Sequence, residues 1–294
     1  MRILVTGATG NVGSEVMDQL LRAGHAAVAG TRDGRYDVQG VGAVKVDFAA
    51  RAPCAGEYDA VFLMRPPQLA DADLFEAFLD GLARDTRIVF LSVQGADRKA
   101  YLPHAKIEAR IVAMGFAHVF VRPSYFMENL LTTLWPELQQ NRRIYLPAGR
   151  LQFDWVSARD VACVIVAALT GGVDGTAITV CSGRRIGFAD ACAEINRIAG
   201  TDLAYRPASL AGFVRHARRK GQAWSYIGVM LLLHYLPRYG RPAQDDCQPV
   251  REVLGRDPET LSAFISRHAA RFSTLRQPAP RPDQGGVTPP DNTA

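Results

Sequence analysis

Short apolar runs alternate with longer amphipathic segments over the first 125 residues of the chain. The apolar runs cover residues 2–6, 26–32, 43–48, 59–64, 87–92 and 117–121. Between the fourth and fifth runs, Leu74, Phe75, Phe78, Leu79 and Leu82 recur at helical spacing. Strands that alternate with helices form parallel sheets with right-handed crossovers. The pattern therefore predicts an α/β fold with a doubly wound parallel sheet.

The pattern becomes less regular beyond residue 129 and predicts a smaller, mainly helical C-terminal region. Expected helices lie before residue 141, at 158–169, at 188–199 and over most of 209–275, with short strands at 143–146, 152–156, 177–181 and 203–206. Ser157 and Asp160 have the spacing of a helix N-cap. The proline- and glycine-rich tail has too few apolar side chains to fold. The predicted domains are 1–175 and 176–275, followed by a disordered tail, 276–294.

The composition is that of an ordinary soluble protein, with 48% hydrophobic and 21% charged residues. A net charge of +5 suits an anionic ligand but does not indicate nucleic-acid binding. Five cysteines without a C-x-x-C pair suggest neither a disulfide framework nor a metal site, so we expect a reducing, cytoplasmic location. We expect no signal segment, and the longest apolar run, 227–236, is too short for a membrane span.

Three glycines follow the first apolar run at intervals of three residues. Gly7 lets the chain reverse, Gly10 lets the backbone approach a pyrophosphate, and Gly13 lets the following helix pack closely on the strand. Backbone N–H groups and the positive end of the helix dipole then face the phosphates. The spacing predicts a dinucleotide site; the alternative is a βαβ unit that binds no nucleotide.

The end of the second apolar run indicates which dinucleotide is bound. An NAD site places a carboxylate there, whereas an NADP site uses arginine for the 2′-phosphate. Arg32 occupies this place, and its guanidinium matches phosphate geometry, so we expect NADP (NADPH). Asp33 could neutralise Arg32 or bind a ribose itself, and Arg32 could instead be only a solvated surface charge.

Several motifs together resemble the NmrA-like family of atypical short-chain dehydrogenases/reductases, which includes quinone reductases, triphenylmethane reductase and ergot-alkaloid reductases. The motifs are Val5–Gly13, Thr31-Arg32, Phe62–Pro67, Arg122–Asn129, Val156–Ala162 and Gly255–Phe264. The resemblance implies a Rossmann sheet with a C-terminal region on the substrate side. The expected cofactor-binding residues are Gly7, Thr9, Gly10, Asn11, Val12, Gly13, Arg32, Asp47, Phe48, Met64, Arg65, Ser92, Lys106, Pro123 and Tyr125. Asp47 could instead be a strand-end turn residue.

The usual catalytic pair of short-chain enzymes, tyrosine and lysine four residues apart on a helix, is not present in its usual form. Tyr101 and Lys106 are five residues apart, and Pro103 places Tyr101 before the helix. The resemblance assigns Lys106 to the nicotinamide ribose, with a salt bridge to Glu108 or solvent as the alternative. If a proton donor is needed, His104 and Tyr125 are the candidates; each could instead serve only in packing.

The resemblance implies an NADPH-dependent reductase that transfers hydride to a small conjugated hydrophobic acceptor, such as an iminium, quinone or enone. Such acceptors need no concerted protonation, so the missing tyrosine is no obstacle. The alternative is a non-catalytic NADP(H)-binding sensor or regulator. We expect a hydrophobic, aromatic small-molecule substrate, a monomer or homodimer, and no metal, nucleic-acid or membrane partner.

Overall fold

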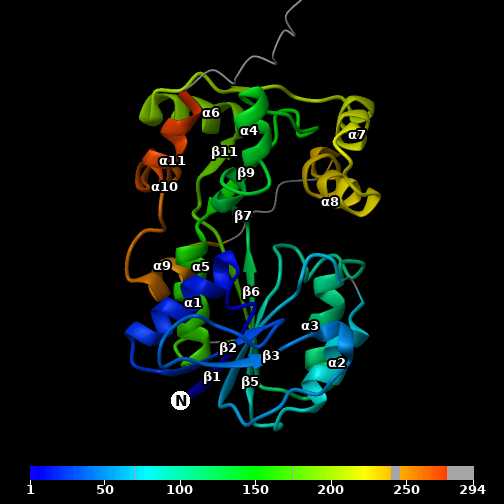
Figure 1. The fold of residues 1–294 in the computed structure, drawn as a ribbon, viewed down its shortest axis with the longest axis vertical. Helices are drawn as coiled ribbons and strands as arrows, with labels where there is room; N and C mark the ends of the chain where they lie inside the picture. The colour runs from blue at the N-terminus through cyan, green and yellow to red at the C-terminus, as the bar shows by residue number, and fades with distance from the viewer. Residues whose placement is uncertain (70, 174, 240–245, 277–294) are drawn as a thin grey trace, which may run out of the picture.

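The computed structural model describes residues 1–69, 71–173, 175–239 and 246–276. Figure 1 shows two regions, one built on a large sheet and the other on helices and short strands. Apart from Arg276, the predicted disordered tail lies outside the described residues.

In the described part, seven parallel strands form the large sheet in the order β10, β6, β5, β4, β1, β2, β3. They are β1 (Arg2–Thr6), β2 (Ala26–Thr31), β3 (Gly42–Lys45), β4 (Ala60–Met64), β5 (Arg87–Leu91), β6 (His118–Pro123) and β10 (Ala177–Val180). The registers are parallel throughout, as in Ile3 with Ala27 and Val61 with Ile88. This sheet confirms the predicted doubly wound α/β fold.

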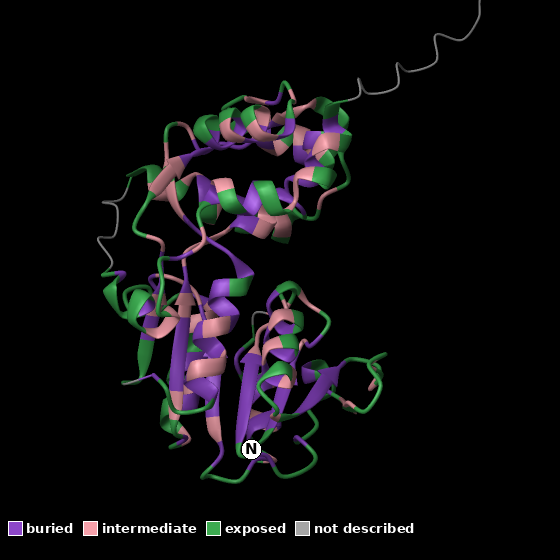
Figure 2. Cartoon of the chain, turned by 90° about the vertical axis from the view of Figure 1, so that its left-hand side faces the viewer, coloured by how far each residue is buried: buried purple, intermediate pink, exposed green. Residues whose placement is uncertain are grey.

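Helices cover both faces of the large sheet (Figure 1). Helices α1 (Asn11–Arg22), α5 (Ala158–Leu169) and α9 (Gln248–Leu254) pack on one face, and α2 (Asp73–Asp80) and α3 (Pro103–Ala113) on the other. The central strands are therefore buried on both sides, as their colour in Figure 2 shows. Ile3, Phe62 and Val89 have no exposed surface. Such continuous apolar burial is typical of parallel strands.

The smaller region contains two short sheets, one ordered β11, β9, β7 and the other formed by β12 and β8. The strands are β7 (Tyr125–Phe126), β8 (Arg143–Ile144), β9 (Gln152–Val156), β11 (Arg185–Gly187) and β12 (Ala204–Tyr205). The helices are α4 (Trp135–Asn141), α6 (Phe188–Ala199), α7 (Leu210–Arg219), α8 (Trp224–His234), α10 (Leu261–Arg267) and α11 (Ala269–Ser273). The 3-10 helices of the chain are η1 (Phe48–Ala50), η2 (Met127–Leu130), η3 (Leu236–Tyr239) and η4 (Thr274–Arg276).

The chain passes between the two regions more than once. Residues 125–155 already contribute to the core of the smaller region, whereas Ile178 and Val180 return to the core beside the large sheet. Val250 also belongs to the large-sheet core, although it lies beyond residue 176. The division at residue 175 stays a prediction about domains.

Several predicted elements differ from the structure at their ends. The third strand stops at Lys45 because Asp47 accepts a hydrogen bond from the N–H of Ala49 and caps η1. The helix expected between the fourth and fifth apolar runs covers only Asp73–Asp80. The helix expected up to residue 141 is divided into η2 and α4, and α4 has a proline in its first turn. The cap at Ser157 is confirmed, because its hydroxyl accepts from the N–H of Asp160.

The expectation of no disulfide was wrong, because Cys181 and Cys247 are bonded to each other. They are 66 residues apart, so local spacing could not pair them. Cys54, Cys163 and Cys192 are free thiols. Among the described helices, none combines the length and apolar composition that a membrane span requires.

Candidate cofactor and acceptor site

Most of the predicted site residues lie in loops at the edge of the large sheet where its parallel strands end. Strand β1 lies between β4 and β2, so the connections on its two sides run in opposite directions. In open α/β sheets, ligands bind outside the carboxyl ends of the strands at such a switch point. The loops after β1, β2, β4, β5 and β6 all meet this edge.

The turn after β1 requires glycine for two different reasons. Gly7 has φ +63°, and a Cβ there would lie 2.8 Å from the side chain of Met64. A Cβ on Gly13 would overlap the carbonyl of Gly7. At Gly10, in contrast, the nearest protein atom would be the Gly7 carbonyl oxygen, 3.2 Å away. Gly7 and Gly13 are therefore needed for the fold, whereas a Cβ on Gly10 would make a single tight contact, with this backbone oxygen, and would otherwise face open space in front of α1.

The first turn of α1 is suited to an anion. Gly10 is the N-cap and offers no side-chain cap, so the early N–H groups of the helix lack the partner that a serine or aspartate would supply. Thr9 and Asn11 are exposed here, and Val12 is buried against the sheet. These residues fit the pyrophosphate of a dinucleotide, because free N–H groups and the helix dipole both favour negative charge.

Arg32 follows β2 at the same edge and is exposed. It forms no ion pair with any residue that the structure describes. The Asp33 carboxylate instead accepts from the Thr31 hydroxyl at 3.0 Å and from the N–H of Arg35 at 3.1 Å. These bonds, the one from Arg35 above all, hold the pKa of Asp33 below its usual value. Both bonds go to Oδ1, and among the described residues the Asp33 carboxylate forms no ion pair with Arg32.

The loop after β3 places its two predicted residues differently. Asp47 is exposed and caps η1, which is the turn role that the sequence left open. Phe48 is only 5% exposed and packs against Phe75 and Phe78, with ring centroids 4.5 and 5.2 Å away. Little of its ring remains for a ligand, and a cofactor role for either residue stays a prediction.

Arg65 organises the loop after β4. One terminal nitrogen of its guanidinium donates to the carbonyl oxygens of Pro66, Pro67 and Leu69 at 3.1, 3.0 and 2.6 Å. Its Nε donates to Nε2 of His104 at 3.3 Å, which joins this loop to the start of α3. Met64, immediately before it, packs over the glycine turn. Met64 and Arg65 therefore both lie at the predicted edge.

His104 is a neutral imidazole in this position. Burial, together with the neighbouring Arg65 charge, lowers the pKa of His104 to about 3. Because Nε2 accepts from Arg65, the ring proton is on Nδ1. The prediction of a proton donor relied on a pKa near neutrality, and that condition does not hold here.

Lys106 and Tyr101 are not brought together. Tyr101 is 61% exposed and precedes α3. Lys106 is exposed on the side of α3 that faces α2. It lines an open cavity of about 480 Å³ together with Asp71, Ala72, Asp73, Ala109, Arg110 and Ala113. The role of Lys106 at the ribose stays a prediction.

A buried polar cluster lies between β5, α3 and β6. The Ser92 hydroxyl donates to Oε1 of Glu108 at 2.5 Å. Arg122 donates to both carboxylate oxygens of Glu108, at 2.9 and 2.6 Å. The alternative of a Lys106–Glu108 salt bridge was therefore wrong. Ser92 is only 4% exposed, so its hydroxyl serves the protein interior; its predicted contact with the cofactor stays a prediction.

The segment after β6 is held on both sides by backbone hydrogen bonds. The carbonyl of Pro123 accepts from the N–H of Gln94 at 3.1 Å, and the N–H of Ser124 donates to the carbonyl of Val180 at 3.0 Å. A carbonyl oxygen has a second lone pair, so Pro123 retains acceptor capacity for a carboxamide. The segment is thus fixed in place between the loop after β5 and strand β10.

Tyr125 is packed among aromatic side chains rather than open to a ligand. Its ring contacts Phe153, Trp155 and Phe188, with centroid separations from 4.7 to 5.8 Å. Burial raises the pKa of its hydroxyl. The hydroxyl donates to Nε2 of His234 on α8 at 3.1 Å, because Nδ1 of this ring donates to the Met230 carbonyl. Its catalytic role stays a prediction.

Two groups at the site were missed by the sequence analysis. Arg122 and Glu108 are 14 residues apart, and His234 is 109 residues from Tyr125. Each pair joins residues of two different elements, so no local pattern could have paired them.

Two curated proteins are similar to this chain over nearly its whole length, whereas no family model matches it. A (4-alkanoyl-5-oxo-2,5-dihydrofuran-3-yl)methyl phosphate reductase from Streptomyces griseus is 32% identical over 286 residues, covering 92% of this chain and 99% of that protein. An NAD(P)H azoreductase from Xenophilus azovorans is 29% identical over 287 residues, with coverages of 92% and 99%.

Solved structures share the fold at lower identity. The NADPH complex of an NADPH-dependent quinone oxidoreductase from Escherichia coli has a TM-score of 0.72 at 18% identity, and covers 91% of this chain and 99% of that one. NmrA, a negative transcriptional regulator solved with NADP, has a TM-score of 0.66 at 12% identity, with coverages of 93% and 96%. Both likenesses concern the fold alone.

Proposed function

Because this chain belongs to the NmrA-like family of atypical short-chain dehydrogenases/reductases, we propose that it is an NADPH-dependent reductase of small, conjugated, hydrophobic acceptors. Two of the curated relatives are named as reductases, one for an azo compound and one for an oxo-dihydrofuran. These names support a conjugated acceptor.

The observation that carries the proposal is the space in front of Gly10. The protein itself would tolerate a side chain there better than at Gly7 or Gly13. Because the fold requires glycine less strictly here than at Gly7 or Gly13, a ligand that approaches the backbone closely accounts for the missing side chain. The uncapped start of α1 lies beside it and favours a ligand that carries negative charge.

Arg32 supports NADPH over NADH. Its guanidinium is exposed at the end of β2 and free of ion pairs within the described residues, while Asp33 is occupied by Thr31 and Arg35. A 2′-phosphate would therefore meet an available positive charge instead of a carboxylate.

The proposed reaction places few demands on protein side chains. NADPH, when bound, supplies the hydride. Arg65 fixes the loop after β4 and contacts His104, which burial keeps neutral, and Pro123 offers a carbonyl beside the loop after β5. A strongly conjugated acceptor can take its proton from water, so no buried acid is required. Lys106 remains the predicted ribose contact.

The proposal is tested by incubating the protein with NADPH and a panel of quinones, iminium compounds, azo dyes and enones while nicotinamide absorbance is followed. We expect loss of absorbance that depends on the acceptor and is faster with NADPH than with NADH. The absence of turnover with every acceptor, despite saturable NADPH binding, would contradict it.

A sensor that binds NADP(H) without turnover is the second candidate. Tyr101 and Lys106 do not form the acid pair of the usual enzymes, which favours this reading. A sensor is expected to bind NADPH tightly and to reduce no member of the panel. The same assay therefore separates the two functions.

A further inference from the structure

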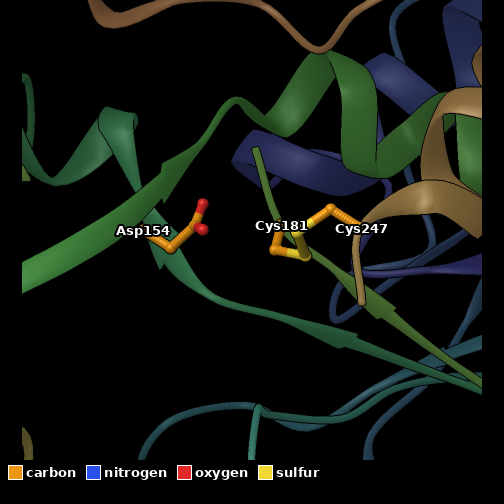
Figure 3. Close-up of side chains that lie close together, drawn as sticks. All are labelled: Asp154, Cys181 and Cys247. Carbon is orange, nitrogen blue, oxygen red and sulfur yellow. A yellow bond between two sulfur atoms is a disulfide. The ribbon is translucent and has the colours of Figure 1, made fainter. Parts of the chain in front are cut away.

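The disulfide lies where the chain leaves the large sheet and where it returns. Cys181 directly follows β10, the edge strand of that sheet, and Cys247 is the residue before α9. Figure 3 shows the two sulfur atoms bonded between these segments, with Asp154 beside them. The Cα atoms are 5.5 Å apart, within the usual range for a disulfide.

The residues between the two cysteines carry β11, α6, β12, α7 and α8. Phe188, Phe213 and Met230 from this stretch are buried in the core of the smaller region. Val180 and Val250, just outside the two cysteines, are buried in the core beside the large sheet. The bond therefore joins the two ends of a chain segment that packs in the smaller region, at the points where this segment meets the large-sheet core.

Cys181 is also adjacent to the segment proposed to meet the nicotinamide. Val180, its neighbour, pairs with Pro123 and accepts a hydrogen bond from the N–H of Ser124. A change in the position of Cys181 would therefore reach this segment through Val180 alone.

Asp154 connects the disulfide to the other side of the same segment. Its carboxylate accepts from the N–H and the hydroxyl of Ser182 at 2.6 and 2.7 Å, and from the N–H of Gly183 at 3.0 Å. Asp154 lies on β9, which pairs with β7 at Tyr125. The residues after β6 are thus held by two strands that meet at the disulfide.

We propose that Cys181 and Cys247 form a reversible thiol–disulfide site that sets how firmly the smaller region holds the segment from Pro123 to Tyr125. When the bond forms, the two thiols lose two electrons and two protons to a low-molecular-weight disulfide such as oxidised glutathione, which becomes two thiols. Excess reduced thiol reverses the step. The consequence for acceptor binding rests on the proposed function; the thiol chemistry does not.

The test compares the full-length protein oxidised with glutathione disulfide and the same protein reduced with dithiothreitol, each freed of reagent. Alkylation and mass spectrometry count the thiols. We expect the closed form to have a Tm higher by roughly 5–10 °C, because closing a long loop restricts the unfolded chain. Opening is expected to raise acceptor KM about threefold or more and also to weaken NADPH binding, because the loosened segment is the one proposed to meet the nicotinamide.

Three variants make the comparison specific. Cys181→Ser and Cys247→Ser are expected to behave as the reduced protein under both treatments. Cys192→Ser is the matched control, since Cys192 is equally buried but free, and it should keep the redox response.

Several results would overturn the proposal. One is that both thiols stay free in glutathione disulfide; another is that the two forms share the same Tm and acceptor KM. Tight zinc binding by the reduced protein, lost in Cys181→Ser, would make these cysteines and Asp154 a metal site instead. If no acceptor is reduced at all, the proposed enzyme function fails, whereas the thiol count and Tm still decide on the disulfide.

Discussion

Replacing Arg32 with alanine tests the cofactor assignment quantitatively. Arg32 has no ion pair within the described residues, so its removal leaves no protein group unpaired and should hardly change stability. A charge-assisted hydrogen bond contributes about 1.5–3 kcal/mol, and the exposure of Arg32 favours the lower end. The expected loss of NADPH affinity is therefore about tenfold to thirtyfold.

NADH lacks the 2′-phosphate, so its affinity should fall by less than about twofold in the same variant. Both dissociation constants can be measured by nicotinamide fluorescence. Raising the salt concentration should shrink the NADPH effect, because screening weakens an exposed charge contact.

Arg22→Ala is the matched control. Arg22 lies in the last turn of α1, at the opposite edge of the sheet, and pairs with Asp18 on the surface. Its removal changes the net charge equally but should leave NADPH affinity unaltered. Equal weakening of NADPH and NADH by Arg32→Ala, or equal effects of the two variants on NADPH, would refute the reasoning.

Three further predictions concern buried and catalytic groups. Glu108→Gln breaks a buried ion pair and should lower the free energy of unfolding by about 3 kcal/mol in urea, whereas Glu76→Gln, at an exposed pair, should lower it by less than about 1 kcal/mol. Burial raises the pKa of Glu128 to about 7, above its unfolded value, so this residue favours folding below pH 4.5 and loses that contribution as pH rises through 7. Glu128→Gln should remove up to about 3 kcal/mol of this pH dependence in thermal melts, and an unchanged profile would contradict the raised pKa. His104→Ala should reduce acceptor turnover more than Lys106→Ala, because His104 is hydrogen-bonded to Arg65 in the loop after β4, whereas Lys106 is exposed; the reverse order in steady-state kinetics would support the ribose assignment of Lys106.

Much of the fold could be predicted from the sequence because its signals are local. The alternation of apolar runs and helical stripes identified the parallel strands, and the predicted helix 188–199 matches α6. The glycine spacing predicted the turn after β1, because the positive φ of Gly7 and the close approach of Gly13 to the Gly7 carbonyl both require glycine. The cap at Ser157 could also be predicted, because its partner Asp160 is only three residues away.

The contacts that could not be predicted join residues far apart in the sequence. Glu108 pairs with Arg122 because α3 packs beside β6, and His234 reaches Tyr125 because α8 packs on β7. The lowered pKa of His104 comes first from its burial and then from the charge of Arg65, which lies on another loop. The Cys181–Cys247 bond depends on where the chain returns to the sheet. None of these leaves a periodic trace in the sequence.

The central claim is that the turn from Gly7 to Gly13 holds the phosphates of NADPH. Calorimetric titration of NADPH into the wild-type protein and Gly10→Ala tests it most directly, because a Cβ at Gly10 has its nearest protein neighbour at 3.2 Å and the variant should still fold. The account predicts saturable binding to the wild type and at least about tenfold weaker binding to the variant, at similar Tm. Equal NADPH affinity in two folded proteins would contradict it.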